Sequence, residues 1–454
     1  MSRELISLAP PAERAILVGA PRKGANAKTL VTEHLEELAR LADTAGALVV
    51  GTITQQLDRP NPSTYLGKGK IEELKAMVAD KEATLVIFDD ELSPGQGKNI
   101  EGELNQRVMD RAELILDIFA TRARSAEARM QVELAQLQYM LPRLTRMWTH
   151  LEKFRGGIGV RGPGETQLET DRRLIQHRIK VLAERLEDVD RAREIQRHGR
   201  KAHFRVGLVG YTNAGKSSIL RSLANDQQVF VEDRLFATLD PLTREIEVGD
   251  GYTVLLTDTV GFIRKLPHHL VASFRATLAE AKEADLLLHV IDASHPAWEE
   301  HRVVVDAVLA DLDLAAQPTI HVMNKMDALT PDDAEALQQR VTNLMPGTLF
   351  VSALESGGLE SLRSALRDSL RNQRPLLEIR IPASNGRLLA EVHRDGEVLD
   401  QRNEEDTMVV RAHLDERAMG RLRQGGARIT VTAASGKNAR RGPVVESAHT
   451  IPIP

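Results

Sequence analysis

One eight-residue glycine loop constrains this chain more than any other feature. Residues 210–217 read Gly-Tyr-Thr-Asn-Ala-Gly-Lys-Ser; they follow the apolar run 206–209 directly and precede a helix-forming stretch at 218–223. This strand–loop–helix context predicts a phosphate-binding loop, in which backbone N–H groups surround an oligophosphate at the positive end of a helix. We expect Lys216 to add a cation to the phosphates and the Ser217 hydroxyl to bind Mg²⁺. The spacing and context disfavour the alternative, a surface turn.

A second motif indicates which base the nucleotide carries. Asn324-Lys325-Met326-Asp327 follows the apolar run 319–323. The Asp327 carboxylate can accept hydrogen bonds from N1–H and the exocyclic amine of guanine, whereas adenine lacks this donor pair. Such a site rejects the wrong base by about 10⁴-fold. We expect Asn324 to brace the loop and the Lys325 stem to lie against the base; a helix N-cap is the alternative interpretation.

Between these motifs lie the parts of a hydrolytic switch. Residues 253–257 predict a strand that ends in Asp258-Thr259-Val260-Gly261. Asp258 would hold a Mg²⁺-bound water, and the Gly261 N–H would face the γ-phosphate. Upstream, Thr238 is the expected hydroxyl that closes over Mg²⁺ and phosphate, with Thr243 as the alternative.

These motifs give a set of expected site residues. We expect Lys216, Thr238 and Gly261 to carry catalysis, and Ser217, Thr238 and Asp258 (through water) to hold the metal. A strand at 348–351 leads into a segment whose backbone could donate to the guanine oxygen. The other expected nucleotide contacts are Gly210, Tyr211, Thr212, Asn213, Ala214, Gly215, Ser218, Phe236, Ala237, Thr259, Val260, Asn324, Lys325, Met326, Asp327, Ser352, Ala353 and Leu354.

Phe262 stands directly after Gly261, where a glutamine would orient the attacking water. A phenyl ring cannot do this, so we expect slow hydrolysis in isolation. Asn213 offers one compensation, because its side-chain oxygen could help coordinate K⁺; bracing the loop is an equal alternative.

Composition limits the remaining classes of function. A chain of 454 residues with 42% hydrophobic residues should hold about three domains. No apolar run approaches the roughly 18 residues that cross a bilayer, so any membrane association would be peripheral. The absence of cysteine excludes disulfides and thiolate zinc sites and fits a reducing cytoplasm, where we expect the protein. The net charge of −5 gives no overall attraction to nucleic acid, so any nucleic-acid-binding surface must be a local basic patch.

The N-terminal 109 residues alternate strand and helix patterns. Strands are predicted at 15–18, 47–53, 84–88 and Val108, with helices at 30–45, 71–79 and 98–105, which favours a small parallel sheet with right-handed crossovers. The loop from Gly67 to Lys70 could hold a phosphate of RNA or of a nucleotide, although a solvated turn is the favoured alternative. Three carboxylates after the third strand, Asp89, Asp90 and Glu91, are interpreted as a solvated rim.

Residues 110–202 predict a long antiparallel helical hairpin that starts at a capping pair, Asp110 and Glu113. Its tip, about 142–164, is basic, aromatic and rich in glycine. Cations neutralise phosphates and aromatic rings stack on unpaired bases, so the tip predicts RNA binding; aromatics folded back on the helices are the alternative. The expected contacts are Arg143, Arg146, Trp148, Lys153, Phe154, Arg155, Gly156, Gly157 and Arg161.

The expected fold class is α/β: a P-loop GTPase domain (203–372) preceded by the small parallel α/β domain (1–109) with its hairpin (110–202), and followed by a small α+β domain (376–454). In the last, strands are predicted at 377–381, 408–412 and 429–432 and helices at 387–392 and 415–422. It shows no catalytic constellation and is interpreted as an interaction domain.

The combination resembles the HflX family of translational GTPases. The resemblance spans most of the chain and rests on residues 65–74, 88–94, 131–137, 141–144, 162–166 and 258–262. It implies a monomeric cytoplasmic GTPase that binds GTP and GDP, binds the large ribosomal subunit and directs the hairpin tip toward ribosomal RNA. In its GTP form such a protein splits stalled or idle 70S ribosomes under stress, and hydrolysis allows release. The resemblance also implies weak ATP use by the N-terminal region, with Gly67 to Lys70 as the candidate site.

Two functions therefore stay open. The first is this ribosome-splitting GTPase. The second is a GTP-dependent regulatory switch for a protein partner, such as a membrane-protease complex, with the tip contacting protein. A metabolic kinase or ATPase is disfavoured by Asp327.

Overall fold

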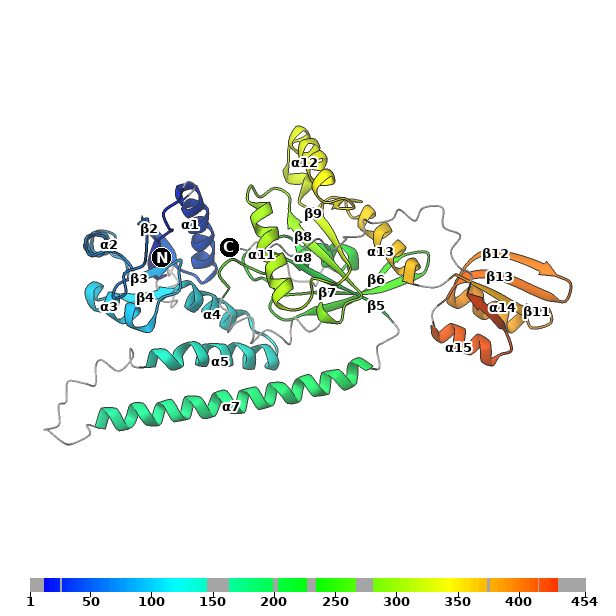
Figure 1. Cartoon of the computed structure of the whole chain (residues 1–454), viewed down its shortest axis with the longest axis horizontal. Helices are drawn as coiled ribbons and strands as arrows, with labels where there is room; N and C mark the ends of the chain where they lie inside the picture. The colour runs from blue at the N-terminus through cyan, green and yellow to red at the C-terminus, as the bar shows by residue number, and fades with distance from the viewer. Residues whose placement is uncertain are drawn as a thin grey trace, which may run out of the picture. The chain divides into compact units, whose positions relative to one another are not determined.

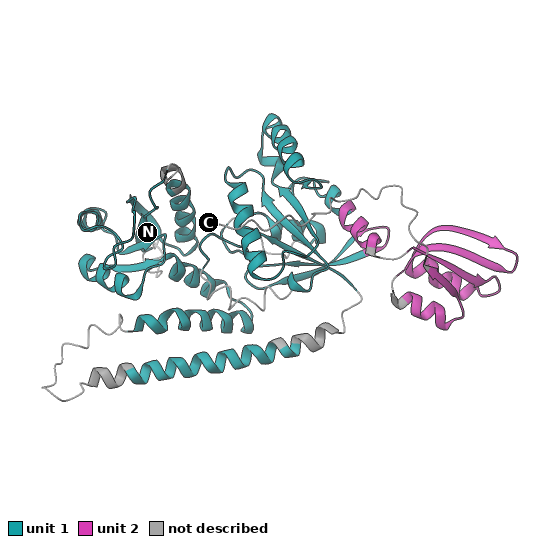
Figure 2. Cartoon of the chain, viewed as in Figure 1, with its two compact units in different colours: residues 1–247, 253–363 teal, residues 248–252, 364–454 magenta. Residues whose placement is uncertain are grey.

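The computed structural model describes residues 12–24, 27–144, 163–198, 203–226, 234–266, 281–373, 376–414 and 416–431. The chain divides into two compact units (Figure 2): residues 1–247 with 253–363, and residues 248–252 with 364–454. The fold is α/β, with a P-loop domain, as the sequence predicts. The domain boundaries drawn from the sequence stay a prediction.

The N-terminal sheet is parallel, and its two central strands are buried on both faces. Its strands β1 (Arg14–Gly19), β2 (Leu48–Thr54), β3 (Leu85–Phe88) and β4 (Arg107–Asp110) lie in the order β2-β1-β3-β4. Along β1, Ala15 and Leu17 pack toward α1 (Ala27–Thr44), whereas Ile16 and Val18 pack toward α2 (Lys68–Asp80) and α3 (Pro94–Leu104). Because both faces are covered, the strands appear as continuous apolar runs. The predicted N-terminal sheet is confirmed.

The helical hairpin differs from the prediction in its first arm. Instead of one helix from residue 110, the chain forms α4 (Arg111–Arg122), breaks, and continues as α5 (Ala126–Met140) and a 3-10 turn, η1 (Leu141–Arg143). α4 is buried on most sides, so it belongs to the core. At the break, the backbone N–H groups of Arg124 and Ser125 donate hydrogen bonds to the distant Asp240 carboxylate, at 3.0 and 3.2 Å. Asp240 thus supplies the partners that the interrupted helix does not. The expected cap holds: Asp110 accepts from the Glu113 N–H at 2.9 Å.

The hairpin that remains is formed by α5 and α7 (Pro163–His198), which run side by side (Figure 1). Arg178 of α7 donates to both carboxylate oxygens of Glu133 on α5, at 2.7 and 2.8 Å. Such a two-pronged contact fixes one helix against the other. α7 begins inside the segment that the sequence assigned to the tip.

The GTPase sheet has the order β10-β9-β8-β5-β7-β6. Its strands are β5 (Phe204–Gly210), β6 (Leu242–Gly249), β7 (Tyr252–Asp258), β8 (Leu286–Asp292), β9 (Thr319–Asn324) and β10 (Leu349–Phe350). The helices are α8 (Lys216–Ala224), α11 (Trp298–Asp311), α12 (Pro331–Leu344) and α13 (Glu360–Gln373), with the 3-10 turn η2 (Met326–Ala328). β5, β7, β8, β9 and β10 are parallel, so their carboxyl ends meet at one edge.

The C-terminal segment forms an antiparallel sheet with two helices. Its elements are β11 (Leu376–Pro382), α14 (Gly386–Asp395), β12 (Glu397–Glu404), β13 (Thr407–His413), α15 (Glu416–Gln424) and β14 (Arg428–Val431), with the strand order β12-β13-β11-β14. This is the βαββαβ topology of ferredoxin-like folds. β12 was not predicted, because it is mostly polar and exposed.

Within the described residues, we find no helix that combines the length and the apolar character needed to cross a membrane.

Candidate nucleotide-binding site

The carboxyl ends of the parallel strands enclose a cavity of about 410 Å³. It lies where ligands bind in open parallel sheets. Motifs that are more than a hundred residues apart in the sequence meet here. The predicted residues that line it are Thr212, Asn213, Gly215, Lys216, Ser217, Ser218, Phe236, Ala237, Thr238, Thr259, Gly261, Asn324, Lys325, Asp327, Ala353 and Leu354; Arg234 and Ala328 line it without having been predicted.

The phosphate loop adopts backbone conformations that its glycines allow. Gly215 has a φ of +94° and leads into α8, while Asn213 has a φ of 60°. A side chain at Gly215 would collide with the Asn324 amide. The Lys216 ammonium is buried and donates to the carbonyl oxygens of Gly210 (3.1 Å) and Tyr211 (2.9 Å). The loop therefore places a cation at the N-terminus of α8.

The three expected metal-binding residues lie together. The Ser217 hydroxyl donates to Asp258 Oδ2 at 2.6 Å and is 2.7 Å from the Thr238 hydroxyl. Thr243, the alternative to Thr238, is instead 2.9 Å from the Thr257 hydroxyl, on a neighbouring strand. The geometry favours Thr238.

Asp258 has the properties expected of a residue that needs a cation. Its Oδ1 atom is buried and has no hydrogen-bond partner among the described residues. Burial raises the pKa of Asp258 above its ordinary value, although Lys216 opposes the shift. A divalent cation held with Ser217 and Thr238 would offset this cost, so the residues fit Mg²⁺.

The segment after Asp258 is fastened to the phosphate loop. The Phe262 N–H donates to Gly210 O at 3.1 Å, and the Thr212 N–H donates to Phe262 O at 2.7 Å. Gly261 lies so close to Thr212 that a β-carbon would collide with its backbone. The Phe262 ring is buried and therefore contributes to the core and not to the cavity.

At the guanine end, Asn324 joins two loops. Its Nδ2 donates to Ala214 O at 2.9 Å, and its Oδ1 accepts from the Ala353 N–H at 3.2 Å. Lys325 pairs with Asp292 at 2.7 Å, and Asp327 accepts a hydrogen bond from the Ser352 hydroxyl. Ser352 thus orients the carboxylate expected to read guanine. The donation from residues 352–354 to the guanine oxygen stays a prediction.

Tyr211 has a different role from the one expected of a nucleotide contact. Its ring stacks on His301, with 3.8 Å between ring centroids, and its hydroxyl donates to Glu37. The side chain lines a neighbouring cavity of about 790 Å³ and not the nucleotide cavity. Only its backbone belongs to the phosphate loop.

Comparisons with known proteins agree with this site. Family models described as GTP-binding GTPase N-terminal, GTP-binding GTPase Middle Region and 50S ribosome-binding GTPase match residues 32–120, 122–200 and 205–325. The chain is 45% identical to GTPase HflX of Flavobacterium psychrophilum over 377 residues, which cover 79% of the chain and 91% of that relative. It is also 45% identical to GTPase HflX of Escherichia coli over 379 residues, which cover 83% and 88%.

The chain belongs to the HflX family of GTPases. The reaction that it catalyses is therefore the hydrolysis of GTP to GDP and phosphate. Among solved structures, it is similar to a GTP-binding protein from Sulfolobus solfataricus in complex with GDP, with 26% identity, coverage of 79% of this chain and 98% of that chain, and a TM-score of 0.42.

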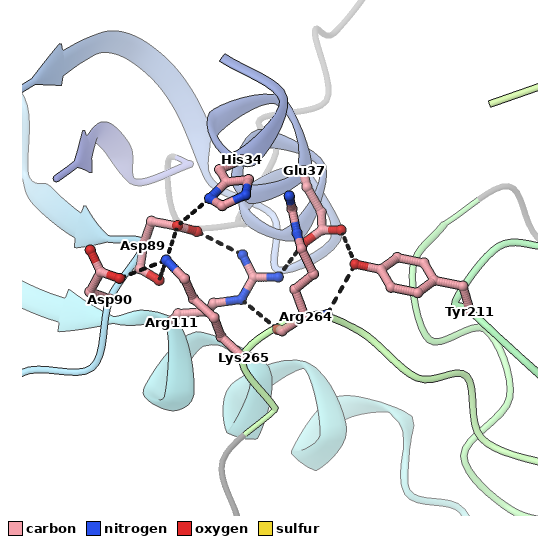
Figure 3. Close-up of polar contacts among 8 residues, drawn as sticks. All are labelled: His34, Glu37, Asp89, Asp90, Arg111, Tyr211, Arg264 and Lys265. Atoms are coloured by element: carbon pink, nitrogen blue, oxygen red, sulfur yellow. Dashed lines mark hydrogen bonds and ion pairs between the residues drawn. The ribbon is translucent and has the colours of Figure 1, made fainter. Parts of the chain in front are cut away.

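A buried ion-pair network around the site was missed by sequence reasoning (Figure 3). Arg111 at the start of α4 pairs with Glu37 of α1 and with Asp89 after β3, the latter at 2.8 Å. The arginine also donates to the carbonyl oxygen of Arg264 at 3.2 Å, and the Arg264 N–H donates to the Tyr211 hydroxyl at 3.0 Å. The network thus links the N-terminal sheet to the phosphate loop and to the segment after Gly261.

Asp89 corrects one sequence expectation. The sequence pattern indicates a solvated rim, yet Asp89 is 3% exposed and also binds Lys265 at 2.6 Å. Burial raises the pKa of Asp89, but His34, Arg111 and Lys265 together lower it by more. The pKa of the carboxyl is therefore held well below its usual range. No local pattern signals this, because its partners lie 22 to 176 residues away.

The structure changes the interpretation of two further predicted sites, the loop from Gly67 to Lys70 and Arg143. Gly67 is the N-cap of α2, but its N–H donates to Gln55 at 2.9 Å, and Lys70 pairs with Glu73 at 2.7 Å. These partners favour the turn interpretation over a phosphate site. Arg143 was expected on the RNA-binding tip, but it is buried.

The guanidinium of Arg143 is occupied within the fold. It donates to Leu92 O at 2.7 Å and to Asp110 Oδ2 at 3.3 Å, and it lies 3.6 Å from the centroid of the Tyr139 ring. A guanidinium held in this way is not available to a phosphate, so Arg143 is removed from the RNA contacts. The other predicted contacts, Arg146, Trp148, Lys153, Phe154, Arg155, Gly156, Gly157 and Arg161, lie outside the described residues.

Lys216 gives a pH prediction. Burial lowers its pKa to about 8, with Asp258 opposing the shift. Phosphate anions favour the charged ammonium, so bound nucleotide should raise this pKa. Between about pH 8 and pH 10 we expect GDP binding to take up a proton and the affinity to fall as pH rises. Calorimetry in two buffers of different ionisation enthalpy measures the uptake. The same uptake in Lys216→Met would contradict this assignment.

Arg111 gives a stability prediction. Arg111→Met leaves the Glu37 and Asp89 carboxylates buried without their shared cation, which should cost about 3–5 kcal/mol. Hydrogen exchange at α4 amides measures the loss. As a control, Arg173→Met removes an exposed pair with Glu169 and should change the same amides by less than about 0.5 kcal/mol. Equal effects of the two substitutions on hydrogen exchange would show that the network does not stabilise α4.

Proposed function

We propose that this GTPase binds the large ribosomal subunit, that its GTP form splits stalled or idle 70S ribosomes under stress, and that hydrolysis allows its release. The proposal is supported by the basic, aromatic sequence at about 142–164, which connects in sequence two helices that pack on each other, α5 and α7. A family model described as a 50S ribosome-binding GTPase, matching residues 205–325, supports the ribosome as the target.

Recognition of RNA would come from the connecting stretch. Arg146, Lys153, Arg155 and Arg161 supply cations that neutralise phosphates. Trp148 and Phe154 supply rings that stack on unpaired bases, and Gly156 and Gly157 allow close backbone approach. This assignment rests on the sequence of the stretch.

For hydrolysis, Ser217, Thr238 and Asp258 (through water) would hold Mg²⁺, which when bound neutralises charge on the phosphates. Lys216 would hold the β- and γ-phosphates, and the Gly261 N–H would face the γ-phosphate. Because residue 262 is a buried phenylalanine, no glutamine stands at that position to orient water, and we propose that turnover is slow without the ribosome. Asn213 lines the cavity and could help coordinate K⁺, in which case turnover would differ between K⁺ and Na⁺ buffers.

The nucleotide state would reach the rest of the molecule through the segment after Gly261. Arg264 and Lys265 follow it by three and four residues and contact Glu37, Asp89 and Asp90 of the N-terminal part. Movement of Gly261 on loss of the γ-phosphate would therefore change contacts with the N-terminal sheet.

Sucrose-gradient sedimentation of ribosomes with a non-hydrolysable GTP analogue tests the proposal. The wild-type protein should migrate with the large subunit and reduce the 70S peak. Arg146→Glu with Arg155→Glu should abolish both effects while GTP affinity is unchanged, because neither residue belongs to the phosphate or guanine motifs. A matched double charge reversal, Lys75→Glu with Lys98→Glu, alters exposed lysines on α2 and α3 and should leave both effects intact.

Failure of the wild-type protein to migrate with the large subunit would contradict the proposal. Co-sedimentation that persists after RNA digestion and at high salt would point instead to the second candidate, a switch for a protein partner, because RNA binding weakens steeply with ionic strength.

A further inference from the structure

Two histidines and one carboxylate meet between the GTPase sheet and α11. His289 on β8 and His321 on β9 are direct partners in the parallel pairing, and their ring centroids are 5.4 Å apart. Asp306 projects from α11. One ligand atom from each of the three residues lies within 4.8 Å of the other two. None of the three belongs to the nucleotide cavity or to the ion-pair network around Arg111.

At its Nδ1 atom the buried histidine makes an ion-pair contact of 3.4 Å with Asp306, which is longer than a good hydrogen bond. His289 is 1% exposed, and its Nδ1 atom has no hydrogen-bond partner among the described residues. Buried polar atoms in native proteins nearly always have a partner, and each exception needs an explanation. A bound ion would supply one.

The spacing fits such an ion. His289 Nδ1 and Asp306 Oδ1 are 3.4 Å apart. Two ligands at about 2.0–2.1 Å from a tetrahedral zinc ion are separated by about 3.4 Å, the edge of the tetrahedron. The observed separation is thus close to that of two ligands of one ion.

The surroundings prepare the donors for a metal. Arg302 donates to the other oxygen of Asp306, Oδ2, at 2.7 Å, which orients the carboxylate and leaves Oδ1 directed at His289. Outer partners of this kind are a regular part of metal sites.

We propose that His289, His321 and Asp306 form a binding site for a divalent transition-metal ion, with Zn²⁺ as the best match and water in the fourth position. Two imidazoles with one carboxylate suit zinc, whereas Mg²⁺ prefers a set of oxygen ligands. His321 and Asp306 are partly exposed, which gives an ion access. The site is separate from the proposed Mg²⁺ site and requires no nucleotide.

The ion would tie together the elements beneath the guanine motif. His321 lies three residues before Asn324, His289 three residues before Asp292, and Asp306 on the helix that also carries His301. Binding to the folded state alone should raise the melting temperature in proportion to the logarithm of metal concentration.

Cobalt titration tests the proposal. The full chain, without a histidine tag, is stripped of metal and loaded with GDP and Mg²⁺, and Co²⁺ is added while the visible absorption is recorded. We expect one equivalent of Co²⁺ to bind with the strong visible bands of a tetrahedral site, and Zn²⁺ to displace it. His321→Gln and Asp306→Asn should each weaken binding by at least the roughly 10–100-fold that loss of an outer partner costs.

His177→Gln, which removes an exposed histidine on α7, is the matched control and should bind Co²⁺ like the wild type. Normal GDP affinity in each variant establishes that it is folded. Absence of stoichiometric Co²⁺ binding, or equal binding by the His321→Gln and His177→Gln variants, would overturn the proposal.

Discussion

A single buried amide connects the two halves of the nucleotide site. Asn324, 1% exposed, donates to the carbonyl of Ala214 in the phosphate loop and accepts from the N–H of Ala353 in the loop after β10. The distance between the phosphate end and the base end of the cavity depends on this side chain. Gly215 is required for the same reason, because a β-carbon there would occupy the place of the amide.

The phosphate and guanine motifs were predictable because each consists of neighbouring residues at the end of an apolar strand. The phosphate loop follows β5, Asp258 ends β7 and Asn324 ends β9. Parallel strands bring their carboxyl ends to one edge, so the sequence order alone places these side chains together. The N-terminal sheet was predictable from the same alternation of strand and helix.

The features that were not predictable depend on partners far along the chain. Asp240 accepts the hydrogen bonds of the backbone N–H groups at the break between α4 and α5. Asp89 can be buried because Arg111 and Lys265 neutralise its charge. Arg143 was assigned to the tip from its charge, yet Leu92 and Asp110 hold it within the fold. Charge and periodicity carry no information about such distant partners.

These long-range contacts connect the N-terminal part to the segment after Gly261. Arg264 and Lys265, which follow Gly261, pair with carboxylates of α1 and of the loop after β3. Under the proposed function, this connection would couple ribosome binding to GTP binding.

The most direct test of the account is the affinity of the cavity for GTP, ATP and xanthosine triphosphate, measured by calorimetry for the wild type and for Asp327→Asn. Recognition by the Asp327 carboxylate predicts that the wild type prefers GTP over ATP by about 10⁴-fold. The substitution should weaken GTP binding and favour xanthine, whose oxygen replaces the amine of guanine. Equal affinity of the wild type for GTP and ATP, with no effect of Asp327→Asn, would contradict the account.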